Sequence, residues 1–356
     1  MGNTDYWYDS HENDHPIVGR TNTWGWNDRE WSLHKPPGTV RVAVLGDSYV
    51  EALQVERTSN FLTIAENLLN QNGKRRFELM NFGRSGFTQT EEWLVLKNEI
   101  VGFEPDLIAL FYYAPNDIAD VDSRTTTDRL RPFPVTIGAD DVLLDMGFLH
   151  QTSFRLKELL SPLKNRSALA SMVAERIALF QQTRPARGQS TGNPGDASHL
   201  DHTRGIGGYL SLATDTPDAL YHGNYAVTKA LIATMIRFSA QRNIAFLLVA
   251  LDTPAYVPRV EERLKAIDSS FRFSFFDEDL AQFAAGSGAQ FLGLSALFRA
   301  RYVERGNELH FSQTFQGDGD IVGNLGHAGH WDYVGHRYVA ELLSAKLQAI
   351  VLPSGQ

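Results

Sequence analysis

Five short apolar runs along the chain predict buried β-strands. Apolar and polar residues do not alternate regularly within them, as they would in a strand with one face in water. Segments with helical periodicity lie between the runs, and this order predicts a parallel sheet covered by helices on both faces. The runs are VRVAVLGDS (residues 40–48), FELMNF (77–82), PDLIALFYY (105–113), NIAFLLVAL (243–251) and the weaker AQFLGL (289–294).

The helical segments carry start and stop signals of their own. Residues 59–73 have apolar positions at helical spacing, with Ser59 as the expected N-cap and Gly73 as the expected stop. In the second segment, Thr88 and Glu91 have the spacing of a capping box. The other predicted helices cover residues 225–241, residues 258–267, which begin with a proline, and residues 332–350.

Three regions follow from this pattern. Residues 1–39 show no sustained period and predict an irregular N-terminal arm that packs onto the core through its tryptophans. Residues 40–350 form the α/β domain. Within it, residues 121–222 are too long for a simple connection and predict an inserted cap with helical patches at 154–163 and 169–182.

The composition of the chain argues against several classes of function. The formal net charge is −9 without a long basic run, which gives no electrostatic footprint for nucleic acid. The chain has no cysteine, so disulfides and thiolate catalysis are excluded. No window of about 18 apolar residues predicts a membrane span, and no signal peptide is recognisable. We expect a periplasmic or secreted bacterial protein if a leader is missing, and a cytoplasmic one otherwise.

Three of the predicted strands end in loops that carry candidate chemistry. Ser48 follows the first strand, Gly83 and Gly86 follow the second, and Asn116 and Asp117 follow the third. Because parallel strands bring their carboxyl ends to one edge, these loops place a hydroxyl, a backbone N–H and a side-chain amide together. That set is a nucleophile with two oxyanion donors. The alternative is ordinary turn chemistry, with the serine as a helix cap.

The stretch GNLGHAGHWDYVGHRY (residues 323–338) is rich in histidine. A metal site would use His327 and His330, with the pair His199 and His202. Neither pair has a carboxylate at helical spacing, so we expect no metal and no cofactor. The other interpretation is that His330 is the base for a serine nucleophile.

The order of four separated blocks resembles the SGNH, or GDSL-type, hydrolase family, and a bacterial esterase/acylhydrolase subgroup of it. The blocks are VAVLGDSYVEALQV, NFGRSGF, YYAPND and GHWDYVGHRYVAEL. The resemblance implies a flavodoxin-like, three-layer α/β/α fold with a mostly parallel five-stranded sheet. It also implies ester hydrolysis through an acyl-enzyme, with Ser48 as nucleophile, His330 as base, and Ser48, Gly86 and Asn116 forming the oxyanion hole.

Two departures from the family pattern concern the site. Ala114 stands where the third block usually has glycine. The acidic residue that usually precedes the base by three positions is replaced, because position 327 is His and position 328 is Ala. His330 is then oriented by a carboxylate from elsewhere, by a backbone carbonyl or by nothing. The candidates near it in sequence are Asp318, Asp320, Asp332 and His327, whereas His336 is expected to serve packing.

The sequence therefore predicts a serine esterase that acts on a small O-acyl group such as acetyl. Trp24, Trp26 and Trp331, which we expect in loops, suggest an acylated carbohydrate as substrate. An O-acyltransferase would use the same residues. A catalytically degraded glycan-binding or assembly protein is the alternative from another class, and it is motivated by the missing acid. Neither nucleic acid nor a membrane is expected as partner, and the sequence predicts no oligomeric state.

Overall fold

A computed structural model describes residues 2–8, 15–71, 75–155, 206–306, 309–310 and 329–351. At its centre is a five-stranded sheet in the order β4-β3-β5-β8-β9, with every neighbouring pair parallel. All five predicted strands are confirmed. Their bounds are β3 Thr39–Gly46, β4 Arg76–Gly83, β5 Leu107–Tyr112, β8 Ala245–Ala250 and β9 Gln290–Gly293.

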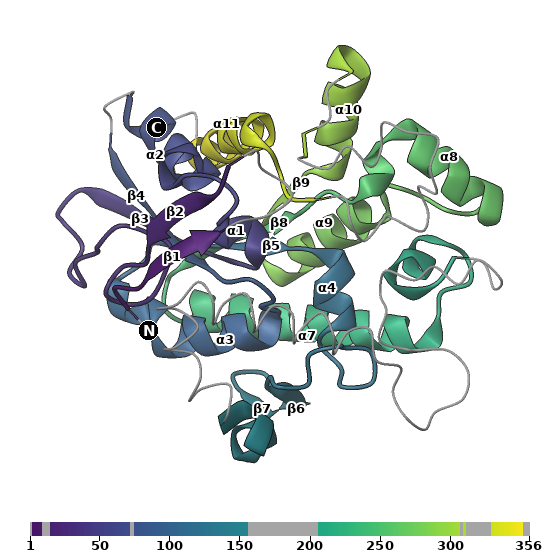
Figure 1. The fold of residues 1–356 in the computed structure, drawn as a ribbon, viewed down its shortest axis with the longest axis horizontal. Coiled ribbons are helices and arrows are strands. Elements are labelled where there is room, and N and C mark those ends of the chain that lie inside the picture. Colours follow the sequence, from purple (N-terminus) through teal and green to yellow (C-terminus); the bar gives the residue numbers. More distant parts are fainter. Residues whose placement is uncertain are drawn as a thin grey trace.

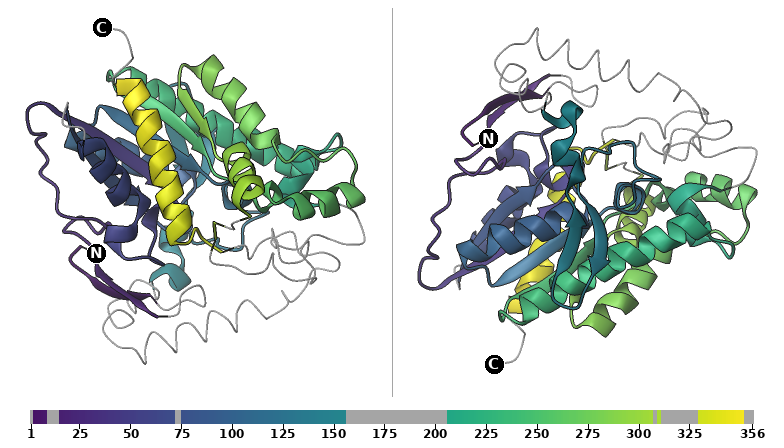
Figure 2. Two further views of the ribbon diagram at one scale, coloured as in Figure 1. Left: turned by 90° about the horizontal axis from the view of Figure 1, so that it is seen from above. Right: turned by 90° about the horizontal axis from the view of Figure 1, so that it is seen from below.

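Helices cover both faces of this sheet (Figures 1 and 2). α2 (Phe61–Gln71) and α11 (Tyr333–Val351) lie side by side on one face. α3 (Gln89–Asn98), α7 (Ala219–Ala240) and α9 (Phe275–Ser287) lie on the other. The predicted three-layer α/β/α fold is therefore confirmed. Further helices are α1 Ser48–Glu51, α4 Ala114–Ala119, α8 Pro258–Ile267 and α10 Ser295–Arg305, with 3₁₀ turns η1 Arg57–Ser59, η2 Ile100–Phe103, η3 Gly147–His150, η4 Gly208–Ala213 and η5 Pro254–Tyr256.

The apolar runs are buried as expected, and β5 has no accessible residue. The capping box of α3 is confirmed, with Thr88 and Glu91 bonded reciprocally. The predicted cap of α2 is wrong by one residue. Ser59 belongs to η1, and the side chain of Asn60 accepts the Leu62 N–H at 2.8 Å instead. Gly73, the expected stop, lies outside the described residues.

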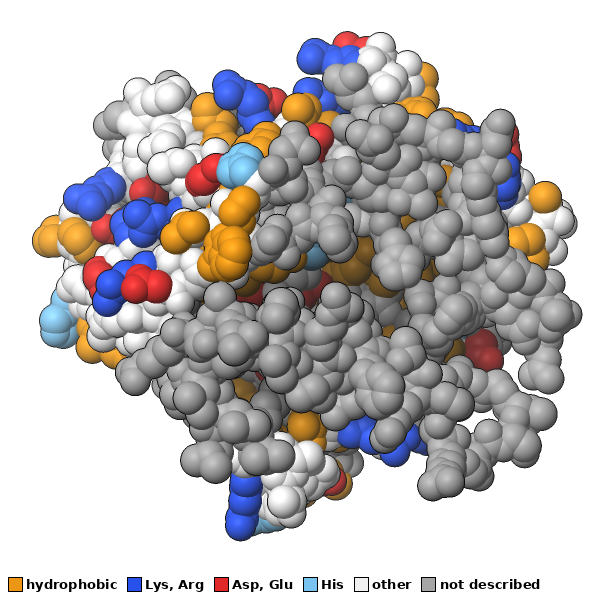
Figure 3. Space-filling model, viewed as in Figure 1, with side chains coloured by type: hydrophobic (Ala, Val, Ile, Leu, Met, Phe, Trp, Pro, Cys, Tyr) orange, Lys and Arg blue, Asp and Glu red, His pale blue; other side chains and the backbone are white. Residues whose placement is uncertain are grey.

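The N-terminal arm is more regular than expected. β1 (Asp5–Tyr8) and β2 (Ile17–Arg20) form a small antiparallel sheet. As predicted, the arm packs onto the core through tryptophan, because the Trp26 ring lies 5.4 Å from Phe82, edge to face. Charged side chains of both signs are interspersed on this side of the molecule (Figure 3).

The predicted insertion is only partly described. β6 (Phe133–Ile137) and β7 (Val142–Asp145) form an antiparallel pair outside the layer of α3 and α7 (Figure 1). Lys97 of α3 bonds Asp141 at 2.7 Å, which ties the turn of this pair to the helix layer. The helical patches at 154–163 and 169–182 fall almost wholly outside the described residues. α7 begins at Ala219, six residues before its predicted start.

Candidate active site

Ser48 lies at the carboxyl edge of the sheet, at the first position of α1 and two residues after β3 ends. The Asp47 side chain caps this short helix by accepting the Tyr49 N–H at 2.9 Å. Asp47 thus braces the turn that presents the serine. The serine hydroxyl is left available for a partner outside its own turn.

Two glycines let α1 lie directly on the strand ends. A Cβ at Gly46 would lie 2.4 Å from a methyl group of Val50, and one at Gly83 would lie 2.4 Å from the backbone nitrogen of Glu51. Real Cβ atoms do not approach other atoms so closely, so any larger residue would push α1 away from the sheet. The glycines of the first two blocks therefore fix the height of Ser48 above the sheet.

His330 lies beside Ser48, although 282 positions separate the two residues in the sequence. Its Nε2 is 2.8 Å from the serine Oγ. The Tyr49 ring lies 5.0 Å from the imidazole, and the Tyr49 hydroxyl donates to the carbonyl of Gly329 at 3.1 Å. A hydroxyl at this distance from an imidazole nitrogen can transfer its proton when it attacks a carbonyl. The structure therefore brings together the two residues predicted as nucleophile and base.

The loop after β4 holds Gly86 in a left-handed conformation, with φ of +78°. Only glycine adopts this conformation without strain. The loop is fixed on both sides of this residue: the Gly86 carbonyl accepts from Arg131 at 2.7 Å, and the Ser85 N–H donates to Glu51 of α1 at 2.8 Å. A fixed backbone amide beside α1 is what an oxyanion donor requires.

Asn116 is held beside the nucleophile's turn. Its Nδ2 donates to the Asp47 carboxylate at 2.8 Å, which leaves the second amide hydrogen for another acceptor. Ala114 and Pro115, the departure from the family pattern, form the first turn of α4. Proline is tolerated there because the first turn of a helix does not use its N–H. The altered block therefore still directs Asn116 toward Asp47.

Three acids are buried behind this site. Burial raises the pKa of Asp47, and hydrogen bonds from Asn116 and Tyr49 oppose the shift. Burial raises the pKa values of Asp117 and Glu92 well above their usual range, and repulsion among these carboxylates adds to the effect. Asp117 accepts the Tyr113 N–H at 2.7 Å. Such shifts cluster at functional sites, where groups are desolvated for chemistry.

The fourth strand contributes a group that the sequence analysis missed. Asp252, two residues after β8, is only 2% exposed. One of its oxygens accepts the indole N–H of Trp331 at 3.0 Å, and the other lies 3.1 Å from Nε2 of His310. His310 and Trp331 are also paired through an isolated antiparallel bridge. The position after a strand was a usable signal, because the same position identified the other three loops.

Trp331 is fully buried, although its polar neighbours made it look exposed. Trp26 is buried as well, against Phe82. Of the three tryptophans expected to contact a carbohydrate, only Trp24 is accessible, at 44% exposure. Buried rings cannot stack on a sugar, so the role proposed for Trp26 and Trp331 is wrong.

His336 has the packing and hydrogen-bonding role expected of it. Its Nδ1 accepts the Phe61 N–H at 3.3 Å, the Gln54 side-chain amide lies 3.3 Å from its Nε2, and its ring stacks on Phe61. Burial lowers the pKa of His336 to about 3, and the nearby His330 adds to the shift. The ring is therefore neutral at physiological pH.

The remaining candidates are only partly described. The Asp332 carboxylate accepts the Gly335 N–H at 2.7 Å and caps α11, and its role in orienting His330 stays a prediction. Asp318, Asp320, His327, His199 and His202 lie outside the described residues. Within the described ranges, no three potential metal ligands converge.

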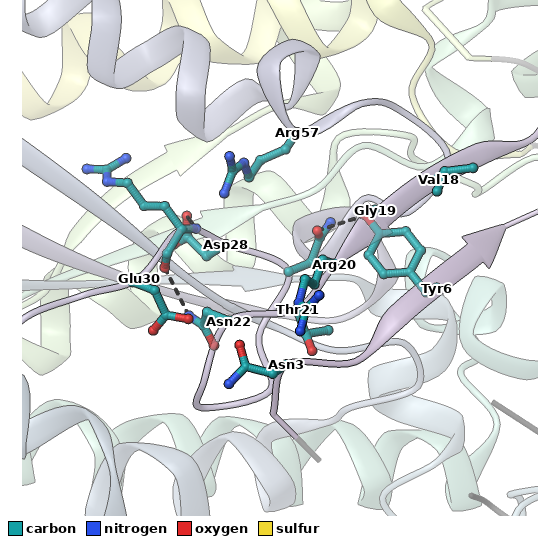
Figure 4. A pocket seen from close by; sticks show the side chains of 12 residues that line it. Asn3, Tyr6, Val18, Gly19, Arg20, Thr21, Asn22, Asp28, Glu30 and Arg57 are labelled. Carbon is teal, nitrogen blue, oxygen red and sulfur yellow. Dashed lines mark hydrogen bonds between the residues drawn. The ribbon is translucent and has the colours of Figure 1, made fainter. Parts of the chain in front are cut away.

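A polar cavity of about 440 Å³ lies away from Ser48, between the arm and η1 (Figure 4). Its walls largely bond to one another: Tyr6 donates to Asn27 at 2.8 Å, and Asn22 donates to the carbonyl of Arg29 at 3.1 Å. The buried Asp28 in its wall accepts from Trp31 and from the backbone of Arg29. This cavity holds none of the predicted catalytic groups.

No helix in the described part of the chain is both long enough and apolar enough to cross a membrane. No protein-family model matches the chain. No curated protein matches it in sequence either.

Several solved structures have a similar course of the chain. An acetyl xylan esterase, AlAXEase, aligns with a TM-score of 0.44 and 14% identity, over 88% of this chain and 100% of its own. A lipase/acylhydrolase from Enterococcus faecalis aligns at 0.42 and 12%, over 89% and 100%. A GDSL-like lipase from Bacteroides thetaiotaomicron aligns at 0.39 and 11%, over 87% and 89%. At this level of similarity the neighbours say nothing of the substrate or of the residues that act on it.

Proposed function

We propose that the chain is a serine esterase that hydrolyses small O-acyl esters. The observation that carries the proposal is the 2.8 Å contact between Ser48 Oγ and His330 Nε2 at the carboxyl edge of a parallel sheet. Ligands of open α/β sheets bind at this edge, and a hydroxyl paired with an imidazole is the arrangement that activates a serine.

The chemistry follows the triad logic in two steps. Ser48 Oγ attacks the ester carbonyl while His330 takes the hydroxyl proton, and the proton then passes to the leaving alcohol as the C–O bond breaks. Water, deprotonated by His330, then attacks the acyl-enzyme. The bond between the acyl carbon and Ser48 Oγ breaks, His330 returns the proton to Oγ, and the acid is released. The Ser48 and Gly86 backbone amides and the free hydrogen of Asn116 Nδ2 are the proposed donors to the oxyanion formed in each step.

The test is hydrolysis of p-nitrophenyl acetate and butyrate, with and without a metal chelator, by wild type and Ser48→Ala. We expect chelator-resistant turnover that falls by about 10⁴ or more without Ser48. Mass spectrometry should find an organophosphonate on Ser48, and labelling should persist in Ser85→Ala, a serine on the neighbouring loop. A folded wild-type protein that neither turns over these esters nor reacts with the phosphonate would contradict the proposal and favour a binding protein.

A second assay, with an acceptor alcohol added, separates hydrolysis from acyl transfer. With an acetylated sugar as donor and a second alcohol present, a hydrolase releases acetate in proportion to the donor consumed. A transferase passes the acetyl group to the alcohol instead. Trp24 is the accessible aromatic residue among the three suspected of sugar contact, so Trp24→Ala is the variant that tests a carbohydrate preference.

A further inference from the structure

We infer that Asp252 is a positioning residue for His330 and acts through Trp331. The inference rests on the proposed function, since it takes His330 as the base. It concerns the question that the sequence raises: positions 327 and 328 hold His and Ala where an acid is expected to orient the base. The described contacts show a second way to fix the imidazole, through the backbone on both sides of it.

The residues on each side of His330 are anchored to different parts of the core. The Gly329 carbonyl accepts the Tyr49 hydroxyl of α1 at 3.1 Å. Trp331 donates its indole N–H to Asp252 at 3.0 Å. His330 therefore lies between one anchor on the nucleophile's own helix and one anchor at the end of β8. These two contacts fix the backbone on both sides of the imidazole.

Asp252 is suited to hold such an anchor. It lies two residues after β8, which is hydrogen-bonded between β5 and β9 and cannot move without disturbing the sheet. Both of its oxygens have partners in a nearly dry environment, where an unpaired carboxylate oxygen would be costly. A bond between an indole N–H and a buried carboxylate is a short-range, directional constraint on the Trp331 ring.

His310 completes the arrangement. Its Nε2 lies 3.1 Å from the second oxygen of Asp252, and its Nδ1 lies 3.4 Å from the Tyr256 hydroxyl. Because the backbones of His310 and Trp331 are bridged, Asp252, His310 and Trp331 form a closed loop of contacts. The preceding residue, Leu309, accepts the Asp332 N–H at 3.0 Å and reinforces the bridge. Because both the indole and the backbone of Trp331 are held, the ring orientation is fixed as well as its position.

A functional consequence is expected because His330 must stay close to Ser48. Displacement of a catalytic group by about 1 Å can cost about 100-fold in rate. Loss of the Trp331 anchor would let the segment from Gly329 to Asp332 relax on one side while the Tyr49 contact holds the other. The imidazole would then spend less time at the distance that allows proton transfer.

The experiment compares Trp331→Phe with Glu78→Gln as the matched control. Trp331→Phe removes the indole N–H and keeps an aromatic ring, whereas Glu78→Gln removes a buried carboxylate at the opposite end of the sheet, where Arg41 is its partner. Both variants should lower Tm. Only Trp331→Phe should lower kcat for p-nitrophenyl acetate, by about tenfold with KM within about twofold of wild type.

Substitution of Asp252 itself gives a second measurement. Asn keeps an oxygen that can accept the Trp331 N–H, so Asp252→Asn should retain about five times the kcat of Asp252→Ala. The folded fraction of each variant is determined by phosphonate titration of Ser48, so that misfolding does not count as loss of rate. Wild-type kcat per titrated site in Trp331→Phe and Asp252→Ala would overturn the inference and leave the network a purely structural role.

If the chain is not an esterase, a measurement that does not need activity tests the positioning role. If wild type neither hydrolyses esters nor reacts with the phosphonate, NMR of the histidine ring signals decides the positioning role alone. The His330 signals, assigned by their disappearance in His330→Gln, should shift in Trp331→Phe and not in Glu78→Gln. Unshifted signals in both variants would overturn the inference.

Discussion

Buried charged groups are paired differently at the two ends of the central sheet. At the amino end, Arg41 of β3 is buried against Glu78 of β4, with its Nε and Nη2 donating to one carboxylate oxygen at 3.0 and 2.8 Å. Its Nη1 donates to the carbonyls of Leu33 and Phe103. A buried ion pair is tolerable when its remaining donors are also satisfied, as they are here. This end of the sheet is built for stability.

At the carboxyl end, no ion pair among the described residues reaches the buried acids Asp47, Asp117 and Glu92, because the buried Arg131 pairs with Glu91 and Asp120 instead. Asp47 is held by neutral donors, Asn116 and the Tyr49 N–H, and burial raises its pKa. Within the described ranges, no hydrogen bond of ordinary geometry reaches one oxygen of Asp117 and both oxygens of Glu92, and the Gln89 side chain is a neutral group that opposes their raised pKa values. Natural proteins break the rule of satisfied buried groups mainly at functional sites. This contrast supports the proposal that the active site lies at the carboxyl end.

The largest expected effect that tests the contrast lies at the amino end. Glu78→Gln leaves the Arg41 guanidinium buried without its counter-charge, and breaking one member of a buried pair costs about 3–5 kcal/mol. We expect that loss in the free energy of unfolding, measured by urea denaturation at pH 7, with kcat of the folded protein unchanged. A comparable loss of kcat would mean that the two ends of the sheet are coupled, and the contrast would fail.

The second largest effect is expected at the carboxyl end, where the quantity measured is kcat. Asn116→Ala removes one oxyanion donor and should lower kcat by about 10²–10³. Asn70→Ala is the matched control, since Asn70 bonds the backbone of Phe77 at the amino end of β4 through both its oxygen and its nitrogen. The control should lose stability and keep its kcat. Unchanged turnover in Asn116→Ala would remove this residue from the site.

Most of the fold could be predicted because the sheet is buried on both faces. Apolar runs without regular alternation, such as residues 40–46, indicate strands buried on both faces, and segments with helical periodicity lie between them. The β1–β2 pair was missed because its strands are four residues long and largely exposed, so no hydrophobic pattern marks them. The cap of α2 was misplaced because Ser59 and Asn60 are both good caps, and only the turn η1 decides between them.

The candidate site could be predicted where its groups follow strands or lie in a recognisable block. Ser48, Asn116 and His330 met these conditions, and the structure places the serine beside the histidine and the asparagine beside Asp47. The pairing of Asp252 with Trp331 could not be predicted, because it joins residues 79 positions apart without any local periodicity. Long-range polar contacts depend on tertiary packing, which a single sequence does not display.

The smallest expected effect concerns His336, the buried neutral group that separates the two helices beside the site. Its pKa of about 3 lies below the ordinary value of 6.5. Between these values the unfolded chain binds a proton that the folded chain does not, so stability falls as the pH falls from 6.5 toward 3. The raised pKa values of Asp47, Asp117 and Glu92 act in the opposite direction, because their folded forms hold protons that the unfolded chain releases as the pH rises.

His336→Gln isolates the histidine from these acids, since glutamine keeps polar atoms near Phe61 and Gln54 and does not titrate. The stability of wild type relative to this variant should be about 2 kcal/mol lower at pH 5 than at pH 7, from about 1.4 kcal/mol for each pH unit below 6.5. Urea denaturation of both proteins at the two pH values measures the difference. A difference that does not change with pH would mean that His336 is protonated in the fold. The carboxyl end would then contain a second buried cation besides Arg131, and its contrast with the amino end would be weaker than the structure indicates.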